Sequence, residues 1–146
     1  MRNSLQIMLL LPSLSFRPLA LACSRLASSS SSTTLTRKIT ESDLRAFSEV
    51  SGDHNAIHAG PGAIVHGVLL AGVVSAAIAR HWPGAILATK ELAFRRPCPV
   101  GTTVVAAVAV EDDSRKLAVL AFKVHEEGDE GKVFVEGKTK VKLPKK

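Results

Sequence analysis

The sequence predicts an α+β domain in which an antiparallel sheet wraps around a long buried central helix. Two observations predict this fold class. The stretch 64–79 is almost entirely apolar and rich in small residues, which is typical of a helix enclosed by other elements. Four segments rich in Val, Thr, Ala and Phe follow, separated by turn residues, as expected of consecutive antiparallel strands. Because a helix and a sheet must each bury an apolar face, we expect them to pack together.

The four predicted strands are expected to form a meander after the buried helix. They cover residues 86–94, 102–111, 117–126 and 132–143. We expect no membrane span, because no segment reaches the ~20 apolar residues that one needs.

A shorter helix is predicted before the buried one. Thr40 is a suitable N-cap, and Asp43 lies in the first turn, where the helix dipole favours negative charge. Apolar residues recur at three-residue spacing from Leu44, which indicates one buried stripe. Gly52 is the predicted C-terminal stop. A short strand over residues 35–39 is expected to precede this helix.

The N-terminal residues have the composition of a targeting segment. They are rich in Ser, Leu and Arg, and the first acidic residue of the chain is Glu41. Such a composition is typical of an organelle transit peptide. We therefore expect residues 1–35 to be a mitochondrial transit peptide and residues 36–146 to form the folded domain. Chloroplast import and secretion are the alternatives, although the apolar run 7–11 is short for a secretory signal.

The overall composition is that of an ordinary soluble globular protein. Hydrophobic residues make up 46% and charged residues 22% of the 146 residues. The formal net charge of +6 fits a mild preference for an acidic partner or substrate. Nucleic-acid binding is disfavoured, because the chain has no Tyr and few aromatic residues for base stacking. Cys23 falls in the predicted leader, so Cys98 has no disulfide partner in the domain.

The segment between the two predicted helices holds the candidate catalytic residues. Asp53 and His58 are five positions apart, so they would diverge by roughly 140° on a helix and face opposite sides of a strand. Only an irregular loop brings both side chains to one point. A carboxylate beside an imidazole can divide acid and base roles at neutral pH. The alternative is an Asx-turn at Asp53 with a merely solvated His58.

His66 and Gly67 lie where the buried helix begins. Backbone N–H groups at a helix start lack partners within the helix and can hold an oxyanion. The alternatives are close packing at Gly67 and a satisfied polar side chain at His66. Arg95 and Arg96, at a strand end, could contact phosphates or form an exposed basic turn. Cys98 has no activating neighbour in the sequence, so we assign it no role.

These residues resemble the motifs of one enzyme family. The run Asp53–His58 resembles the D-x-N-P-x-H motif of the (R)-specific enoyl hydratases and MaoC-like dehydratases. Residues 64–70, Ile-Val-His-Gly-Val-Leu-Leu, resemble the P-I-V-H-G segment that opens the central helix of that family. Residues 92–101 resemble its F-x-x-P-V-x-x-G-D strand and turn. The likeness spans about residues 38–144 of the sequence.

The resemblance implies a hot-dog fold, usually dimeric, and reversible dehydration of a (3R)-hydroxyacyl thioester to a trans-2-enoyl thioester. Asp53 and His58 match the catalytic pair, Asn55 matches a residue that shapes the loop, and Gly67 matches the backbone donor to the thioester carbonyl. We group Asn55 and His66 with Gly67 as candidate oxyanion or substrate-binding residues. The resemblance implies no metal and no other cofactor. With the leader, it implies mitochondrial fatty acid synthesis, with acyl-carrier protein or coenzyme A as carrier.

The sequence departs from the family pattern beside the predicted active loop. Ala56 stands where the motif has proline, and Thr102 stands where the family often has Asp. Only residues 59–63 link His58 to Ile64, where the family has a longer segment. We therefore expect a weakened enzyme.

Three other functions are alternatives to this one. A hot-dog thioesterase would carry its acid on the central helix, but residues 64–79 contain no Asp or Glu. A peroxisomal hydratase is disfavoured because residues 143–146 are not a peroxisomal address. A non-catalytic acyl-thioester-binding protein is the third alternative, and the short link favours it.

Overall fold

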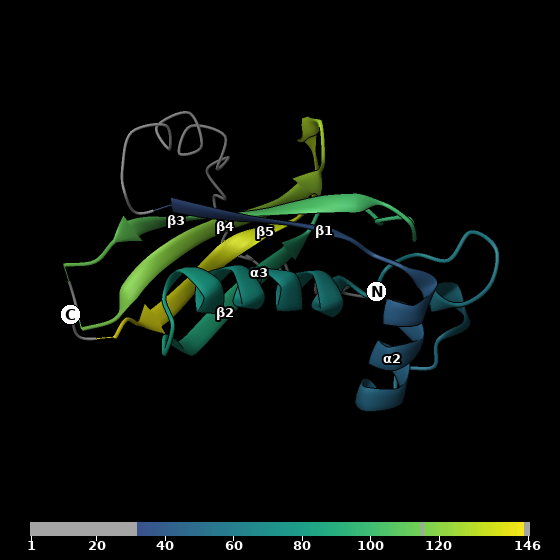
Figure 1. The fold of residues 1–146 in the computed structure, drawn as a ribbon, viewed down its shortest axis with the longest axis horizontal. Coiled ribbons are helices and arrows are strands. Elements are labelled where there is room, and N and C mark those ends of the chain that lie inside the picture. The colour runs from purple at the N-terminus through teal and green to yellow at the C-terminus, as the bar shows by residue number, and fades with distance from the viewer. Residues whose placement is uncertain (1–31, 115, 145–146) are drawn as a thin grey trace, which may run out of the picture.

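The computed structural model describes residues 32–114 and 116–144, which form a five-stranded antiparallel sheet with a long helix against one face (Figure 1). The elements in chain order are β1 (Ser32–Lys38), α2 (Glu41–Ser51), the 3₁₀ helix η2 (Ala56–His58), α3 (Gly67–His81), β2 (Ile86–Phe94), β3 (Thr103–Asp112), β4 (Ala118–Glu126) and β5 (Asp129–Lys142). The order across the sheet is β1-β3-β4-β5-β2. The predicted α+β arrangement is therefore confirmed.

β1 starts inside the range predicted to be the leader. Ser32, Thr33 and Thr34 pair with Ala109, Val108 and Ala107 of β3. Any leader that is removed without damage to the sheet must therefore end before Ser32. The prediction for the preceding residues, 1–31, falls outside the described part of the chain.

The predicted cap and stop of α2 are both confirmed. The Thr40 hydroxyl accepts a hydrogen bond from the Asp43 amide, and the Asp43 carboxylate accepts one from the Thr40 amide. The bond from the Thr40 backbone is the main reason why the pKa of Asp43 is lowered. Gly52 ends the helix with a φ of 75°, a conformation that glycine adopts without steric cost.

α3 places one apolar side on the sheet. Leu70, Val74 and Ile78 are almost completely buried there, at most 2% exposed, at the four-residue spacing of one helix face. The expectation that this helix is buried on every side is wrong for the described chain, because Val68 is 59% exposed and Gly72 is also exposed. The physical reason is that a single sheet covers only one side of the helix (Figure 1). None of the described helices is long and apolar enough to cross a membrane.

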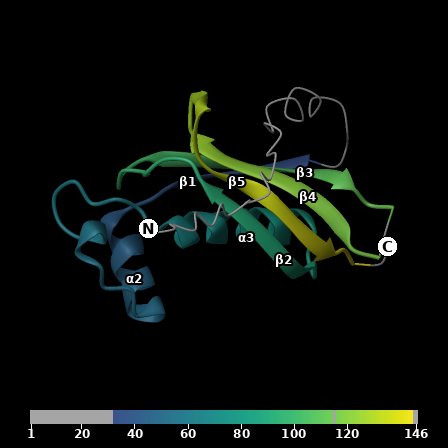
Figure 2. The same cartoon turned by 180° about the vertical axis from the view of Figure 1, so that it is seen from behind.

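The predicted meander is correct for β3, β4 and β5 but wrong for β2. β2 pairs with β5 at the far edge of the sheet instead of with β3, and Figure 2 shows it on that side. The cause lies in residues 95–102, whose prolines are incompatible with a tight hairpin. This connection packs instead on the segment before α3: the Val65 amide donates to the Cys98 carbonyl, and the Val100 amide donates to the Ala63 carbonyl.

Candidate active site

The segment after α2 is held in shape by bonds among its own residues. The Asp53 amide donates to the Ser51 hydroxyl at 3.2 Å, and the Asn55 amide donates to Asp53 Oδ1 at 3.2 Å. The Asn55 side chain caps η2 by accepting a bond from the Ile57 amide at 3.3 Å. This Asx-type geometry occupies Oδ1 of Asp53 and leaves Oδ2 available for other contacts.

Asp53 and His58 meet as the sequence predicted. Asp53 Oδ2 lies 3.9 Å from His58 Nε2. This distance is too long for a direct hydrogen bond, so both atoms can contact one oxygen placed between them. The Asp53 side chain is 48% exposed, whereas that of His58 is 11% exposed. The pair therefore combines a solvent-accessible carboxylate with an imidazole held in place by its surroundings.

A third polar side chain joins the pair from the start of α3. The His66 ring stacks on the His58 ring, with centroids 3.7 Å apart and an interplanar angle of 24°. His66 Nε2 also lies 3.9 Å from Asp53 Oδ2. The ring is only 3% exposed, because Phe47 of α2 packs against it at 4.7 Å between centroids. His66 Nδ1 is buried without a hydrogen-bond partner among the described residues.

Asp53, His58 and His66 also offer three ligand atoms within 4.8 Å of one another, which is a candidate arrangement for a transition metal. The ring stacking argues against joint coordination. An imidazole binds a metal in its own plane, and the two ring planes are nearly parallel and displaced from each other. One ring would have to rotate before both could bind the same ion. The arrangement suits proton transfer better than metal binding.

Gly67 is the first residue of α3, so its amide has no carbonyl within the helix to bond. The Leu69 and Leu70 amides already donate to the His66 carbonyl. The ring of Phe94, from β2, covers the Cα of Gly67: a Cβ at this position would lie 2.4 Å from Phe94 Cε1. The structure therefore places a helix-start amide next to the histidines, together with an apolar ring from the edge strand.

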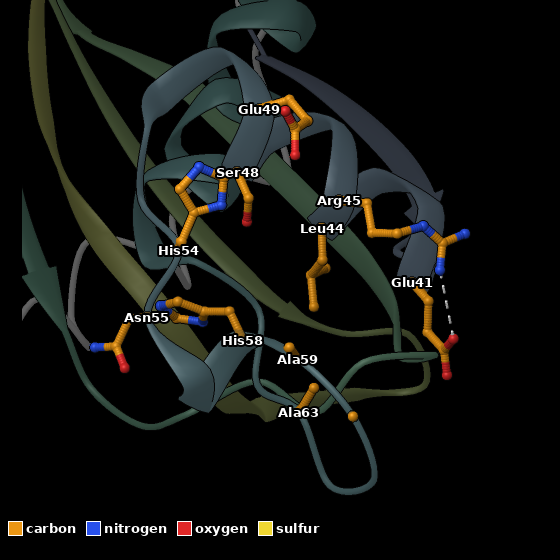
Figure 3. Close-up of a pocket in the computed structure, with 11 residues that line it drawn as sticks. Glu41, Leu44, Arg45, Ser48, Glu49, His54, Asn55, His58, Ala59 and Ala63 are labelled. Carbon is orange, nitrogen blue, oxygen red and sulfur yellow. Dashed lines mark ion pairs between the residues drawn. The ribbon is translucent and has the colours of Figure 1, made fainter.

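A cavity of about 260 Å³ opens beside His58. Figure 3 shows α2 on one side of it and the segment with Asn55, His58, Ala59 and Ala63 on the other. The short link 59–63 borders this cavity as a tight turn, in which the Ala63 amide donates to the Gly60 carbonyl. The short link therefore leaves His58 next to an open space.

A model described as a MaoC like domain matches residues 26–130. The chain belongs to the MaoC-like family. The family resemblance predicted from the motifs is thereby confirmed.

Curated relatives of this MaoC-like chain are dehydratases and hydratases. It is 30% identical over 125 residues to the mitochondrial 3-hydroxyacyl-[acyl-carrier-protein] dehydratase of Arabidopsis thaliana, covering 75% of this chain and 73% of the relative. It is 34% identical over 125 residues to a 3-hydroxybutyryl-CoA dehydratase of Methylorubrum extorquens, covering 77% of this chain and 78% of the relative. The predicted enzyme class, hydro-lyase, is the class to which these relatives belong.

Solved structures confirm the hot-dog fold. The unliganded (R)-hydratase of Pseudomonas aeruginosa matches with a TM-score of 0.72 and 30% identity, over 79% of this chain and 81% of that one. The (R)-hydratase of Aeromonas caviae matches with a TM-score of 0.71 and 29% identity, over 77% and 94% of the chains. A hot-dog-like protein from Thermanaerovibrio acidaminovorans matches with a TM-score of 0.59, over 77% and 80% of the chains, but only 13% identity, which supports the fold alone.

Other residues singled out in the MaoC-like sequence lie at the border of the site or outside it. Asn55 lines the cavity, while its side-chain oxygen caps η2. Arg95 donates to the Glu136 carboxylate at 2.7 Å, and Arg96 is exposed. Cys98 is 1% exposed, and burial raises the pKa of its thiol to about 11. A protonated, buried thiol is unreactive at neutral pH, which agrees with the absence of an assigned role.

The sequence did not identify two groups of residues near this site. Ser48 and Phe47 of α2 contact His66, with 3.5 Å between Ser48 Oγ and His66 Nε2. Lys90 of β2 reaches α3 and donates to Ser75 Oγ at 2.6 Å. For Lys90, the sequence offers one signal, which is a charged residue in the middle of a strand expected to pack on the buried helix.

Proposed function

We propose that this MaoC-like protein interconverts a (3R)-hydroxyacyl thioester with a trans-2-enoyl thioester and water. The observation that carries the proposal is the approach of Asp53 Oδ2 to His58 Nε2, at 3.9 Å, beside the first amide of α3. A reaction that moves one proton from carbon and another to oxygen needs two groups that can contact the same small region. The names of the relatives support the same reaction class.

Dehydration requires three actions at once. A base removes the proton from the carbon next to the thioester, an acid protonates the departing hydroxyl, and a donor stabilises the negative charge on the thioester oxygen. We assign the first two actions to Asp53 and His58 as a pair, without dividing the protons between them, because interacting groups titrate together. We assign the third action to the Gly67 amide at the positive end of α3. In the reverse direction the pair holds and deprotonates one water, whose oxygen bonds to the third carbon, and a proton returns from the pair to the carbon next to the thioester.

The environment of His58 supports this assignment. Its Nδ1 lies 2.7 Å from the Ile64 carbonyl oxygen and donates a hydrogen bond to it. The neutral ring therefore carries its hydrogen on Nδ1 and has a lone pair on Nε2, the atom that faces Asp53. His66, whose ring is buried beneath that of His58, is better placed to position the pair than to contact substrate.

For the carrier and the compartment, we propose acyl-carrier protein and the mitochondrion. The support is the Ser- and Arg-rich, acid-free N-terminal sequence and the similarity to the mitochondrial Arabidopsis dehydratase. Rates measured with crotonyl groups on acyl-carrier protein and on coenzyme A separate the two carriers. A higher kcat/KM on coenzyme A would contradict the choice of acyl-carrier protein.

We propose a homodimer in which two sheets join edge to edge at β2. β2 is an edge strand, and it carries Ile86, Leu92 and Phe94, three of the large hydrophobic side chains that are exposed in the described chain. An unpaired edge with exposed apolar residues tends to be covered. Pairing of two copies of β2 would cover this edge, including the exposed Ile86 side chain.

The alternative is an acyl-thioester-binding protein without turnover, and the open cavity beside His58 is the observation that favours it. Purified protein is tested with a crotonyl thioester by following the loss of the enoyl absorbance and the chirality of the product. We expect (3R)-hydroxybutyryl thioester. Binding of the thioester without hydration would support the alternative, and formation of the (3S) product would contradict the proposed stereochemistry.

A further inference from the structure

Lys90 carries an ammonium group into the space between β2 and α3. Its Nζ donates to Ser75 Oγ at 2.6 Å and to the Ala71 carbonyl at 2.9 Å, and it lies 5.8 Å from the centroid of the Phe122 ring. Burial lowers the pKa of Lys90. In residues 32–114 and 116–144 it forms no ion pair with a carboxylate. An ammonium has three hydrogens, so one is left for a further acceptor.

This ammonium lies along the same face of α3 as the proposed oxyanion donor. Gly67, Ala71 and Ser75 follow one another at four-residue spacing, which places them on one side of the helix. Phe94 contacts the first of them, and Lys90 bonds to the other two. Ala71 is about 6 Å from Gly67 along the helix axis, given the rise per residue. Ser75 is about 12 Å from Gly67 on the same basis. Lys90 bonds to both Ala71 and Ser75, so it lies between one and two helical turns beyond the proposed place of the thioester carbonyl.

The two sides of the reaction centre differ in polarity. The cavity next to α2 is lined by the charged side chains of Glu41, Arg45 and Glu49, which are poor neighbours for a hydrocarbon. On the β2 side, Lys90, Leu92 and Phe94 are two positions apart along the strand, so their side chains project from the same face. The side chains of Leu92 and Phe94 are apolar and partly exposed, 36% and 57% respectively. The β2 side is therefore the better surface for an acyl tail.

We propose that the acyl tail lies on α3 between Gly67 and Ser75, against Leu92 and Phe94, and that Lys90 selects a short tail ending in a hydrogen-bond acceptor. This inference rests on the proposed function. A terminal carboxylate can take the remaining ammonium hydrogen in a charge-assisted bond. A long alkyl tail would instead cover the ammonium and remove its remaining contact with water, which is unfavourable. Lys90 is thus a specificity-determining residue, and the substrate class is an enoyl thioester with a short, oxygen-bearing tail.

Three thioesters of coenzyme A test the inference: crotonyl, trans-2-octenoyl and the mono-thioester of trans-2-hexenedioic acid. Lys90→Met keeps the length of the side chain but removes its charge. We expect it to raise the octenoyl-to-crotonyl ratio of kcat/KM by roughly tenfold or more, and to lower the hexenedioyl-to-crotonyl ratio by the same order. Lys90→Gln keeps a hydrogen-bond donor but removes the charge, so it should also lower the hexenedioyl-to-crotonyl ratio. This second variant tests the inference if Lys90→Met fails to fold.

Lys140→Met is the matched control, because Lys140 is exposed on the neighbouring strand β5, opposite Thr89 of β2. It should leave both ratios unchanged. A purely structural role of Lys90 would lower all three rates together and leave the ratios unchanged, and that result in a folded variant overturns the inference. If the wild type hydrates none of the substrates, the proposed function fails. The Kd ratios of butyryl, octanoyl and adipyl coenzyme A, measured by calorimetry, then test Lys90 with the same expected directions.

Discussion

His58 donates a hydrogen bond of 2.7 Å from Nδ1 to the carbonyl oxygen of Ile64. Ile64 returns a bond to the same turn, because its amide donates to the Ile57 carbonyl at 3.0 Å. These two bonds close the short link 59–63 and fix the imidazole relative to the segment that leads into α3. The chain thus orients His58 through the backbone of a residue that lies three positions before Gly67.

Adding a methyl group at Gly67 should lower the activity of the protein more than its stability. A Cβ there meets the ring of Phe94, which is partly exposed and able to move, so we expect Gly67→Ala to fold. The displaced ring and the shifted start of α3 should lower hydration of a crotonyl thioester by roughly 10²-fold, as small misplacements do in active sites.

Gly72→Ala, on the same helix, is the matched control for that substitution. Nothing lies within 4 Å of a Cβ at Gly72, so this variant should be as active as the wild type and more stable by about 0.5–1 kcal/mol. Stability is measured by chemical denaturation. Equal activity of the two variants would contradict a role for the start of α3.

The short link after His58 should reduce turnover more than stability. The cavity beside His58 exposes the pair to water, which weakens each electrostatic interaction in the site. Insertion of a segment of the length found in relatives, between His58 and Ile64, should raise kcat on a hydroxyacyl thioester. If the unmodified protein already equals a relative with the longer segment, the extra residues are dispensable.

Assembly should depend on the edge strand β2. Ile86→Lys places a charge on the proposed dimer edge, where the native side chain is 61% exposed, and should shift the protein toward a monomer. Val50→Lys adds the same charge at an exposed position of α2, away from this edge, and should leave the dimer intact. Light scattering at micromolar concentration measures both. A wild-type monomer would contradict edge-to-edge pairing.

Mature protein isolated from the organelle should begin at or before Ser32. β1 starts at that residue, and its first three residues pair with β3, so a later cut would remove part of the sheet. Mass spectrometry of the isolated protein gives the N-terminus. An intact Met1 in the main cellular pool would contradict import with cleavage.

Local features of the fold were predictable from the sequence, because local interactions determine them. Thr40 and Gly52 set the two ends of α2 through hydrogen bonds to residues within four positions. The convergence of Asp53 and His58 could be predicted because their segment is an irregular loop, and only such a loop can bring side chains five positions apart to one point. The edge position of β2 was not predictable from strand patterns, because it depends on how residues 95–102 pack on residues 63–65.

The contacts that His66 and Lys90 make with other elements could not be predicted from the sequence either. The stacking of His66 on His58 depends on how α2 docks against the start of α3, which places Phe47 over the ring. The contacts of Lys90 likewise depend on the distance between β2 and α3. Neither follows from the spacing of residues along one element.

Hydration of a crotonyl thioester by Asp53→Asn and His58→Ala tests the central claim most directly. Each variant should lose roughly 10²-fold or more in kcat, the scale of general acid–base groups, while circular dichroism shows an unchanged fold. Asp113→Asn and His81→Ala make the same chemical changes at exposed positions and should keep wild-type rates. Full activity in a folded Asp53→Asn or His58→Ala variant would contradict the assignment of these two residues as the catalytic pair.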